Sequence, residues 1–230
     1  MRNNIQPIAL NESKRDPAVL EIQEIFSTLQ GEGPFAGVPA IFIRLAGCNL
    51  QCPFCDTDYT SKAVFLDLDE ITTRINSVRG MNTRLVVVTG GEPFRQNLSE
   101  LLPMLHNQFE LVQIETNGTL FQEVPQRTVV ICSPKTARIH PKLAQRANAF
   151  KYVVTAGDVD LIDGLPLHAL NHPATRLYRP PADDSRTIYV QPIDVHDPVL
   201  NAVHLEAAVD SCLNYGYRLC LQLHKICGLA

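Results

Sequence analysis

Short apolar runs recur along the chain from Glu21 onward, and polar segments separate them. The runs are short and rich in β-branched residues, a pattern typical of buried strands. The expected strands cover residues 22–29, 40–45, 85–88, 111–114, 128–131, 150–154, 187–190 and 219–223.

Segments with helical periodicity lie between several of these runs. Alternation of strands and helices implies a parallel sheet of the α/β class. The segment 161–186 contains four prolines and has weak periodicity, so a late crossover is expected to be irregular. The expected helices cover 68–78 after the capping residue Asp67, 98–107 after Asn97, 141–148, and 198–215 closed by Gly216.

Composition bounds the class of protein. The chain has 230 residues, of which 45% are hydrophobic and 19% charged, values that exclude a disordered, fibrous or coiled-coil protein. Residues 1–20 are polar and have little periodicity, so we interpret them as a loose N-terminal extension and residues 21–230 as one core domain. The formal charge of −4 gives no global basic surface for nucleic acid.

Neither a signal peptide nor a membrane anchor is expected. The first residues lack the apolar segment of a signal peptide, and no uncharged apolar run approaches the length of a membrane span. We therefore expect a cytoplasmic protein that makes no membrane contact.

Three of the seven cysteines form a tight group, Cys48, Cys52 and Cys55, directly after an expected strand. A C-x3-C-x2-C trio indicates a metal site rather than a disulfide framework. One interpretation is structural zinc with Cys132 or His224 as fourth ligand, which would make the protein a non-catalytic binding module. The other is an iron–sulfur cube with one iron left open.

Polar clusters follow five of the expected strands, at residues 89–93, 115–118, 133–135, 191–194 and 222–225. The carboxyl ends of parallel strands converge on one face of the sheet, where ligands bind. Turn chemistry explains glycine and proline in these clusters, but it explains Lys135, Gln191 and His224 poorly. The sequence therefore predicts one site lined by several strand ends.

These motifs together resemble a known family. The cysteine trio with Phe54 before its last member resembles the radical S-adenosylmethionine signature, and residues 89–93 resemble that superfamily's glycine-rich motif. Residues 29–33, 37–44, 55–57, 114–118, 133–135, 191–193 and 224–225 narrow the resemblance to the 7-carboxy-7-deazaguanine synthases, over about residues 21–230.

The resemblance implies a partial (β/α)6 barrel, a homodimer, and a [4Fe–4S] cluster on the three cysteines. S-adenosylmethionine would chelate the open iron, and an electron donor such as flavodoxin would reduce the cluster. The 5′-deoxyadenosyl radical would take hydrogen from C6 of 6-carboxy-5,6,7,8-tetrahydropterin. Ring contraction with loss of ammonia would give 7-carboxy-7-deazaguanine, a precursor of queuosine. Another radical S-adenosylmethionine enzyme, such as a glycyl-radical activating enzyme, is the nearest alternative.

The resemblance also implies residue roles, and it assigns no catalytic residue beyond the cluster and the cofactor. The expected S-adenosylmethionine contacts are Phe54 beside the adenine, Gly90, Gly91 and Glu92 at the methionine moiety, and Ser133, Pro134, Lys135, Gln191, Pro192, Ile193 and Asp194. The expected pterin contacts are Leu29, Gln30, Gly31, Glu32, Arg44, Thr89, Glu115, His224 and the terminal Ala230.

Three of these assignments have a physical rationale. An ionised Glu115 can accept two parallel N–H bonds from a pyrimidine edge, and the fork of Arg44 matches a carboxylate. In the family that the chain resembles, the position of Thr57 ligates Mg2+ beside the substrate carboxylate, and a hydroxyl oxygen is a hard ligand of the kind that Mg2+ takes. The alternatives are a salt-bridged Arg44, a hydrogen-bonded core His224 and a loop-capping Thr57.

Overall fold

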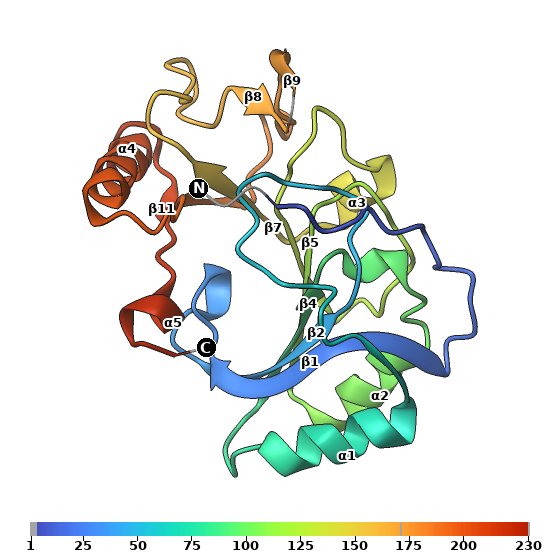
Figure 1. The fold of residues 1–230 in the computed structure, drawn as a ribbon. Helices are drawn as coiled ribbons and strands as arrows, with labels where there is room; N and C mark the ends of the chain where they lie inside the picture. The colour runs from blue at the N-terminus through green and yellow to red at the C-terminus, as the bar shows by residue number, and fades with distance from the viewer. Residues whose placement is uncertain (1–3, 171, 230) are drawn as a thin grey trace.

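The computed structural model describes residues 4–170 and 172–229, and these residues form a mixed sheet flanked by helices (Figure 1). The strands of the sheet are β1 (Val19–Leu29), β2 (Pro39–Leu45), β3 (Val64–Asp67), β4 (Leu85–Gly90), β5 (Leu111–Thr116), β6 (Val129–Cys132), β7 (Ala149–Val154), β10 (Thr187–Pro192) and β11 (Arg218–Leu219). The remaining elements are the short strands β8 (His168–Ala169) and β9 (His172–Arg176), the helices α1 (Leu68–Val78), α2 (Leu101–Gln108), α3 (Pro141–Arg146), α4 (Pro198–Tyr215) and α5 (Leu223–Ile226), and the 3-10 turns η1 (Gly33–Phe35) and η2 (Pro93–Arg95).

The main sheet confirms the predicted α/β class. Its order among the described residues is β11-β10-β7-β6-β5-β4-β2-β1-β3, and neighbours from β2 through β11 are parallel. Strands β3 and β11 form its two edges, so the sheet curves without closing into a complete barrel. Strand β1 is antiparallel to both β2 and β3. A short connection through η1 joins β1 to β2, and short connections allow only antiparallel neighbours.

The crossovers are less regular than full (β/α) repetition. The late one between β7 and β10 holds the β8–β9 pair instead of a helix in its described residues, as its prolines predict. The connection from β5 to β6 is fully described and also lacks an α-helix. Within the described chain, no helix is long and apolar enough to cross a membrane.

The ends of α1 and α4 follow the sequence signals, whereas α3 ends at Arg146 instead of the predicted Asn148, and α2 and the segment 219–223 also depart from the prediction. Asp67 and Glu70 form a capping box at α1, and Gly216 closes α4 with a positive φ of 75°. Helix α2 begins three residues later than the pattern predicts, because the Asn97 side chain accepts a hydrogen bond from the Ser99 amide in a turn of its own. Residues 219–223 are not one strand, since β11 ends at Leu219 and α5 begins at Leu223.

The two faces of the sheet serve different purposes. Helices α1 to α4 cover one face, where Val86 and Val88 of β4 are completely buried in the main core with Ile71, Leu101 and other helix residues. Leu85 and Val87 point to the opposite face, where Ala40 joins them in a small apolar cluster. Because side chains alternate along a strand, Thr89 continues this inner face at the carboxyl end of β4. The inner face is therefore apolar at its base and polar at its rim.

Residues 4–20, the described part of the expected extension, are not loose. Strand β1 already begins at Val19, and residues from Asn4 to Arg15 bond to the body of the protein. The Ala9 amide donates to the Cys48 carbonyl at 2.7 Å, and the Glu12 amide donates to the Arg95 carbonyl at 2.7 Å. The prediction failed because these residues are held by polar contacts to distant segments, which leave no periodic apolar pattern.

Candidate active site

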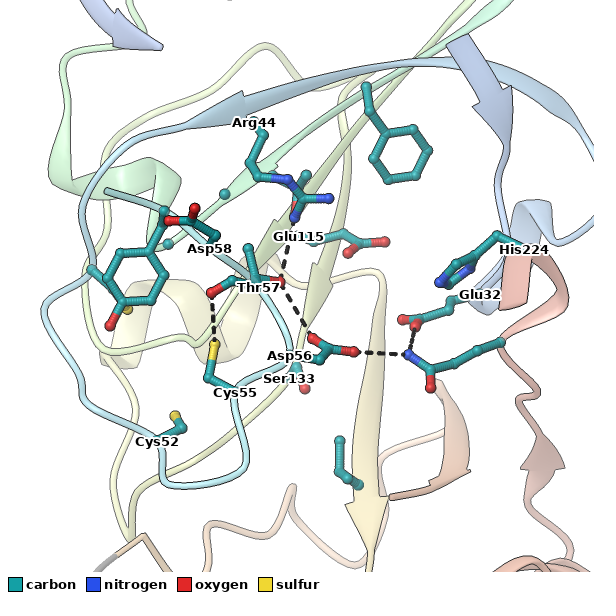
Figure 2. A pocket seen from close by; sticks show the side chains of 18 of the residues that line it. Glu32, Arg44, Cys52, Cys55, Asp56, Thr57, Asp58, Glu115, Ser133 and His224 are labelled. Carbon is teal, nitrogen blue, oxygen red and sulfur yellow. Dashed lines mark hydrogen bonds between the residues drawn. The ribbon is translucent and has the colours of Figure 1, made fainter. Parts of the chain in front are cut away.

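A cavity of about 510 Å³ opens on the inner face at the carboxyl ends of the parallel strands (Figure 2). All five polar clusters that follow the expected strands contribute to its wall. The expected site residues in the wall are Leu29, Gln30, Glu32, Arg44, Cys48, Cys52, Phe54, Cys55, Thr57, Thr89, Gly90, Gly91, Glu115, Ser133, Lys135, Gln191, Ile193, Asp194 and His224.

Three thiols occupy one end of this cavity. Cys48 follows β2, and Cys52 and Cys55 lie on the irregular loop between β2 and β3. All seven cysteines of the chain lie within the described residues and are free thiols. The Cys55 Sγ faces the Thr57 carbonyl at 3.6 Å (Figure 2). Among the described residues, no three Cys, His, Asp or Glu side chains are already gathered around a point that could hold a metal ion.

The donor set nevertheless fits an iron–sulfur cluster with an open iron. Cys132 lies in the main core and Cys220 Sγ accepts from the Gly33 amide at 3.2 Å, and neither lines the cavity, so its wall offers three thiols and no fourth. Burial raises the pKa of Cys48 to about 12 and that of Cys52 to about 11, and it also raises the pKa of Cys55. The thiols are therefore protonated at neutral pH until a metal displaces their protons.

These raised thiol pKa values predict that iron loading of the apoprotein strengthens as pH rises from about 7 to 9. Each thiolate ligand must lose a proton on binding, so a lower proton concentration favours the loaded state. Anaerobic iron titrations at a series of pH values measure this dependence. Equal apparent affinity across the range would contradict the thiol ligand set.

The end of β4 lies very close to the backbone of Leu45 and Gly47, where the loop that carries the three cysteines begins. A Cβ built on Gly91 would lie 2.1 Å from the Gly47 carbonyl oxygen, and one on Gly90 would lie 2.2 Å from that of Leu45. Only glycine permits this approach, which brings the Gly90–Gly91 backbone into the cavity wall beside Cys48.

Glu92 does not take the position expected of it. Its side chain is completely buried and does not line the cavity. Its carboxylate accepts hydrogen bonds from Thr116 Oγ1 at 2.7 Å, the Asn117 amide at 2.8 Å and the Phe94 amide at 3.0 Å. Burial raises the pKa of Glu92 to about 7, although these three bonds lower it in part. Glu92 thus joins the end of β4 to the end of β5.

Lys135 lines the cavity near the thiol of Cys52. Its ammonium group donates to the carbonyl and hydroxyl of Ser133, and burial lowers its pKa while the nearby Cys52 opposes the shift. Gln191, Ile193 and Asp194 complete this part of the wall. Pro134 and Pro192 were also expected at the site, but they do not line the cavity.

Carboxylates and a lysine occupy the opposite end. Glu115 Oε1 accepts from the side-chain amides of Gln30 and Gln113, each at 3.0 Å, and Glu115 Oε2 lies 3.9 Å from Lys151 Nζ. Lys151 also pairs with Glu32, whose second oxygen accepts from Gln222 at 3.0 Å. One oxygen of Glu115 is therefore engaged by two amides, and the other faces the cavity and Lys151.

Lys151 is the principal site residue that the sequence interpretation missed. It is 8% exposed in the middle of strand β7. Burial alone would lower its pKa, but Glu32 and Glu115 raise it above its ordinary value, so the side chain is cationic. The sequence contains a signal for this role, because a lysine inside an apolar strand of a parallel sheet is costly unless its charge is paired.

Helix α5 brings His224 to the same end of the cavity, beside the end of β1 (Figure 1). A Cβ on Gly31 would lie 2.0 Å from His224 Nδ1, so Gly31 is the residue against which the imidazole packs rather than part of the cavity wall. Burial lowers the pKa of His224, partly opposed by Glu32, so the imidazole is neutral at pH 7.

An ion-pair bridge fastens α5 over the cavity. Lys225 Nζ lies 2.9 Å from both Asp56 Oδ2 and Asp194 Oδ2, so it joins α5 to the loop after Cys55 and to the end of β10. Gln222 Nε2 adds a bond to Asp56 at 3.3 Å (Figure 2). The terminal Ala230, expected to contact substrate, lies outside the described residues.

Arg44 and Thr57 lie between the two ends of the cavity (Figure 2). Arg44 Nε bonds to Glu24 at 2.7 Å, and its Nη1 lies 3.4 Å from Thr57 Oγ1. Thr57 does not cap the loop, because the amides of Thr60 and Ser61 are accepted by Asp58 instead. The arginine fork and the threonine hydroxyl therefore form one polar group.

Comparison with known proteins agrees with this geometry. The Radical SAM superfamily model matches residues 42–129, which include the cysteine loop and β4 to β5. The chain is 46% identical over 224 residues to the 7-carboxy-7-deazaguanine synthase of Rhodospirillum rubrum, with 94% of each chain covered. It is 38% identical over 226 residues to the synthase of Rickettsia prowazekii, covering 93% of this chain and 90% of that one.

A solved structure shows the same fold. The crystal structure of QueE from Escherichia coli superposes with a TM-score of 0.69 at 30% sequence identity, covering 89% of this chain and 94% of that one. Fold, cysteine loop and glycine-rich strand end define a radical S-adenosylmethionine enzyme. Within that superfamily, the chain belongs to the 7-carboxy-7-deazaguanine synthase family.

Membership of this family settles the cofactor class. A radical S-adenosylmethionine enzyme carries a [4Fe–4S] cluster and uses S-adenosylmethionine, and the three-thiol cavity fits that pair. The alternative of a zinc-stabilised binding module is therefore wrong.

Proposed function

We propose that the chain converts 6-carboxy-5,6,7,8-tetrahydropterin to 7-carboxy-7-deazaguanine with loss of ammonia, in the biosynthesis of queuosine and related 7-deazapurines. The observation that carries this proposal is the division of one cavity into two ends. Three thiols lie at one end and a Glu32–Lys151–Glu115 group lies at the other, with Arg44 and Thr57 between them. A cofactor site and a site for a polar bicyclic substrate thus face each other.

The substrate end matches the chemistry of a carboxylated pterin. Glu115 Oε2 faces the cavity and would accept from the amino and ring N–H groups of the pyrimidine edge. The stacked Phe26 and Phe42 rings, 5.4 Å apart, line the wall beside Arg44 and offer apolar surface to the ring system. Glu24 binds Nε of Arg44 and Thr57 Oγ1 accepts from its Nη1, which leaves Nη2 and the remaining Nη1 hydrogen to donate to the substrate carboxylate.

The other end would hold S-adenosylmethionine. The backbone carbonyl groups of Gly90 and Gly91 would accept hydrogen bonds from the methionine ammonium, and Phe54 would flank the adenine. The ribose and carboxylate would contact Ser133, Lys135, Gln191, Ile193 and Asp194. When bound, the cluster and S-adenosylmethionine supply the radical that removes hydrogen from C6 of the substrate. The protein contributes position and charge, and it excludes water from the buried end of the cavity.

We further propose that the enzyme is a cytoplasmic homodimer that receives electrons from a flavodoxin-like donor. The motifs that resemble the 7-carboxy-7-deazaguanine synthases are the basis of this proposal. Nucleic acid is not among the proposed partners, since the formal charge is −4.

Turnover with matched pterins tests the proposed substrate. Anaerobically reconstituted enzyme with S-adenosylmethionine and a reductant should form 7-carboxy-7-deazaguanine from the 6-carboxylated pterin, as detected by mass spectrometry. A tetrahydropterin without the carboxylate should give no ring-contracted product, because Arg44 then has no substrate group to hold in place. Equal conversion of both pterins would contradict the assignment of Arg44.

A second prediction concerns Thr57, which we propose as a ligand of Mg2+ beside the substrate carboxylate. A hydroxyl is a weak ligand, and Mg2+ recruits substrate oxygens and waters, so the site should form fully only with substrate bound. Thr57→Ala should raise the Mg2+ concentration needed for half-maximal rate and lower turnover, while the iron–sulfur spectrum stays unchanged. Mg2+ titrations after chelator treatment measure this, and identical curves for Thr57→Ala and wild type would remove Thr57 from the metal site.

A further inference from the structure

Residues 47–60, here called the cluster loop, carry all three cysteines of the trio and Thr57. Every residue between β2 and β3 is described, and none belongs to a helix or a strand. The loop is closed at its base by the Gly47 amide, which donates to the Tyr59 carbonyl at 2.9 Å. A loop of this kind needs outside contacts to hold one conformation, because its own backbone bonds are few.

Gln6 makes contacts with both halves of the cluster loop. Its Nε2 donates to the Thr57 carbonyl at 2.9 Å, and its Oε1 accepts from the Tyr59 amide at 2.8 Å and from Thr60 Oγ1 at 3.2 Å. Its backbone carbonyl accepts from Gln51 Nε2 at 2.8 Å. One glutamine therefore joins the segment just before Cys52 to the segment just after Cys55.

The residues on either side of Gln6 extend this attachment. Asn4 Nδ2 donates to the hydroxyl of the buried Tyr59 at 3.2 Å. Ile8 forms a parallel bridge with Cys48, and the Ala9 amide donates to the Cys48 carbonyl at 2.7 Å. Further along, Glu12 pairs at 2.9 Å with the buried Arg95.

Apolar burial does not hold this segment in place. The side chains of Ile5 and Leu10 are 88% and 80% exposed. The segment is bound through hydrogen bonds and one ion pair, and the core of the domain lies elsewhere. Its contacts can therefore be removed without a large loss of core packing.

We propose that residues 4–12 form a strap that positions the cluster loop, and that Gln6 is its principal positioning residue. The role of the cluster loop in binding iron rests on the proposed function, whereas the contacts by which the strap fixes the loop do not depend on it. With the strap in place, the two segments that flank Cys52 and Cys55 are fixed relative to Cys48. Without it, the loop would sample conformations that separate the thiols and expose bound iron.

Gln6→Met tests the proposal, because methionine keeps the length of the side chain and removes its bonds to Thr57, Tyr59 and Thr60, while the bond from Gln51 to the backbone carbonyl remains. Asn11→Ala is the matched control, since the Asn11 side chain accepts from the Ser13 amide in its own turn and, among the described residues, makes no hydrogen bond to the cluster loop. Two quantities are measured: amide hydrogen exchange of the apoprotein over Tyr59 and Thr60, and the rate at which a ferrous chelator removes iron from reconstituted protein. A thermal unfolding scan confirms that each variant is folded.

Both quantities should rise at least about fivefold in Gln6→Met, the factor that one neutral hydrogen bond contributes, and neither should change in Asn11→Ala. Unchanged exchange would show that Gln6 does not hold the loop. Faster exchange with unchanged iron release would show that the strap does not protect the cluster. Either result overturns the proposal, and the exchange arm reports on the strap even if the protein has another substrate.

Discussion

Replacing any one of Cys48, Cys52 or Cys55 by alanine should abolish reductive cleavage of S-adenosylmethionine. The cavity wall offers three thiols and no substitute among the other cysteines, so the loss of one leaves the cluster with two protein ligands. Each variant should also lose iron on reconstitution. Cleavage is measured as 5′-deoxyadenosine formed under reducing, oxygen-free conditions.

Cys227→Ala provides the control for this series, because Cys227 is exposed and lies outside the cavity wall. It should retain iron and cleavage at the level of the wild type. Full cleavage in Cys48→Ala, Cys52→Ala or Cys55→Ala would mean that the trio is not the cluster site.

Lys151→Met should cost about 3–5 kcal/mol of stability at pH 8 and remove most pterin turnover. The change leaves Glu32 and Glu115 facing each other in a buried site without their cation, and breaking a buried pair from one side has a cost of this size. Their repulsion would move Glu115 away from the position in which its Oε2 faces Lys151 and the cavity, so the KM for the pterin should rise.

The pH dependence of this loss has a definite sign. In the wild type, Lys151 lowers the pKa of Glu32, although burial opposes it, so the pair contributes stability above pH ~4.5 that is lost as pH falls. The variant lacks that contribution, so the difference in free energy of unfolding should be complete at about pH 6 and should shrink toward about pH 3, below the ordinary pKa of Glu32. Urea unfolding at both values measures it, with the exposed Lys142→Met as control. A difference that does not depend on pH would contradict an ionic role for Lys151.

The sequence pattern predicted those features that depend on local chemistry. The Asp67 cap and the Gly216 stop define α1 and α4 as expected, and the polar strand ends do converge on one cavity. The β-strand expected over 219–223 failed because β11 pairs with β10 over only two residues. The chain then turns, and the Leu223 amide donates to the Gly31 carbonyl at 3.1 Å, which places α5 over the cavity. Such a contact between distant segments leaves no periodicity to detect.

The same difference between local motifs and contacts of distant segments decided which site residues could be predicted. Residues within short motifs, such as the cysteine trio and Gly90–Gly91, were predicted from their neighbours. Glu92 belongs to such a motif, yet its carboxylate bonds to Phe94, Thr116 and Asn117, which only the packing of β4 against β5 brings together. Lys151 is flanked by apolar residues, so its role depends on Glu32, which is distant in sequence and adjacent in space.

Isotope transfer from C6 of the pterin tests the central claim most directly. Enzyme supplied with S-adenosylmethionine, a reductant and 6-carboxytetrahydropterin deuterated at C6 should give 7-carboxy-7-deazaguanine, and deuterium should appear in the adenosyl fragment. This result requires that the two ends of the cavity hold cofactor and substrate against each other. Formation of 5′-deoxyadenosine without deuterium, and without the deazaguanine product, would contradict the account.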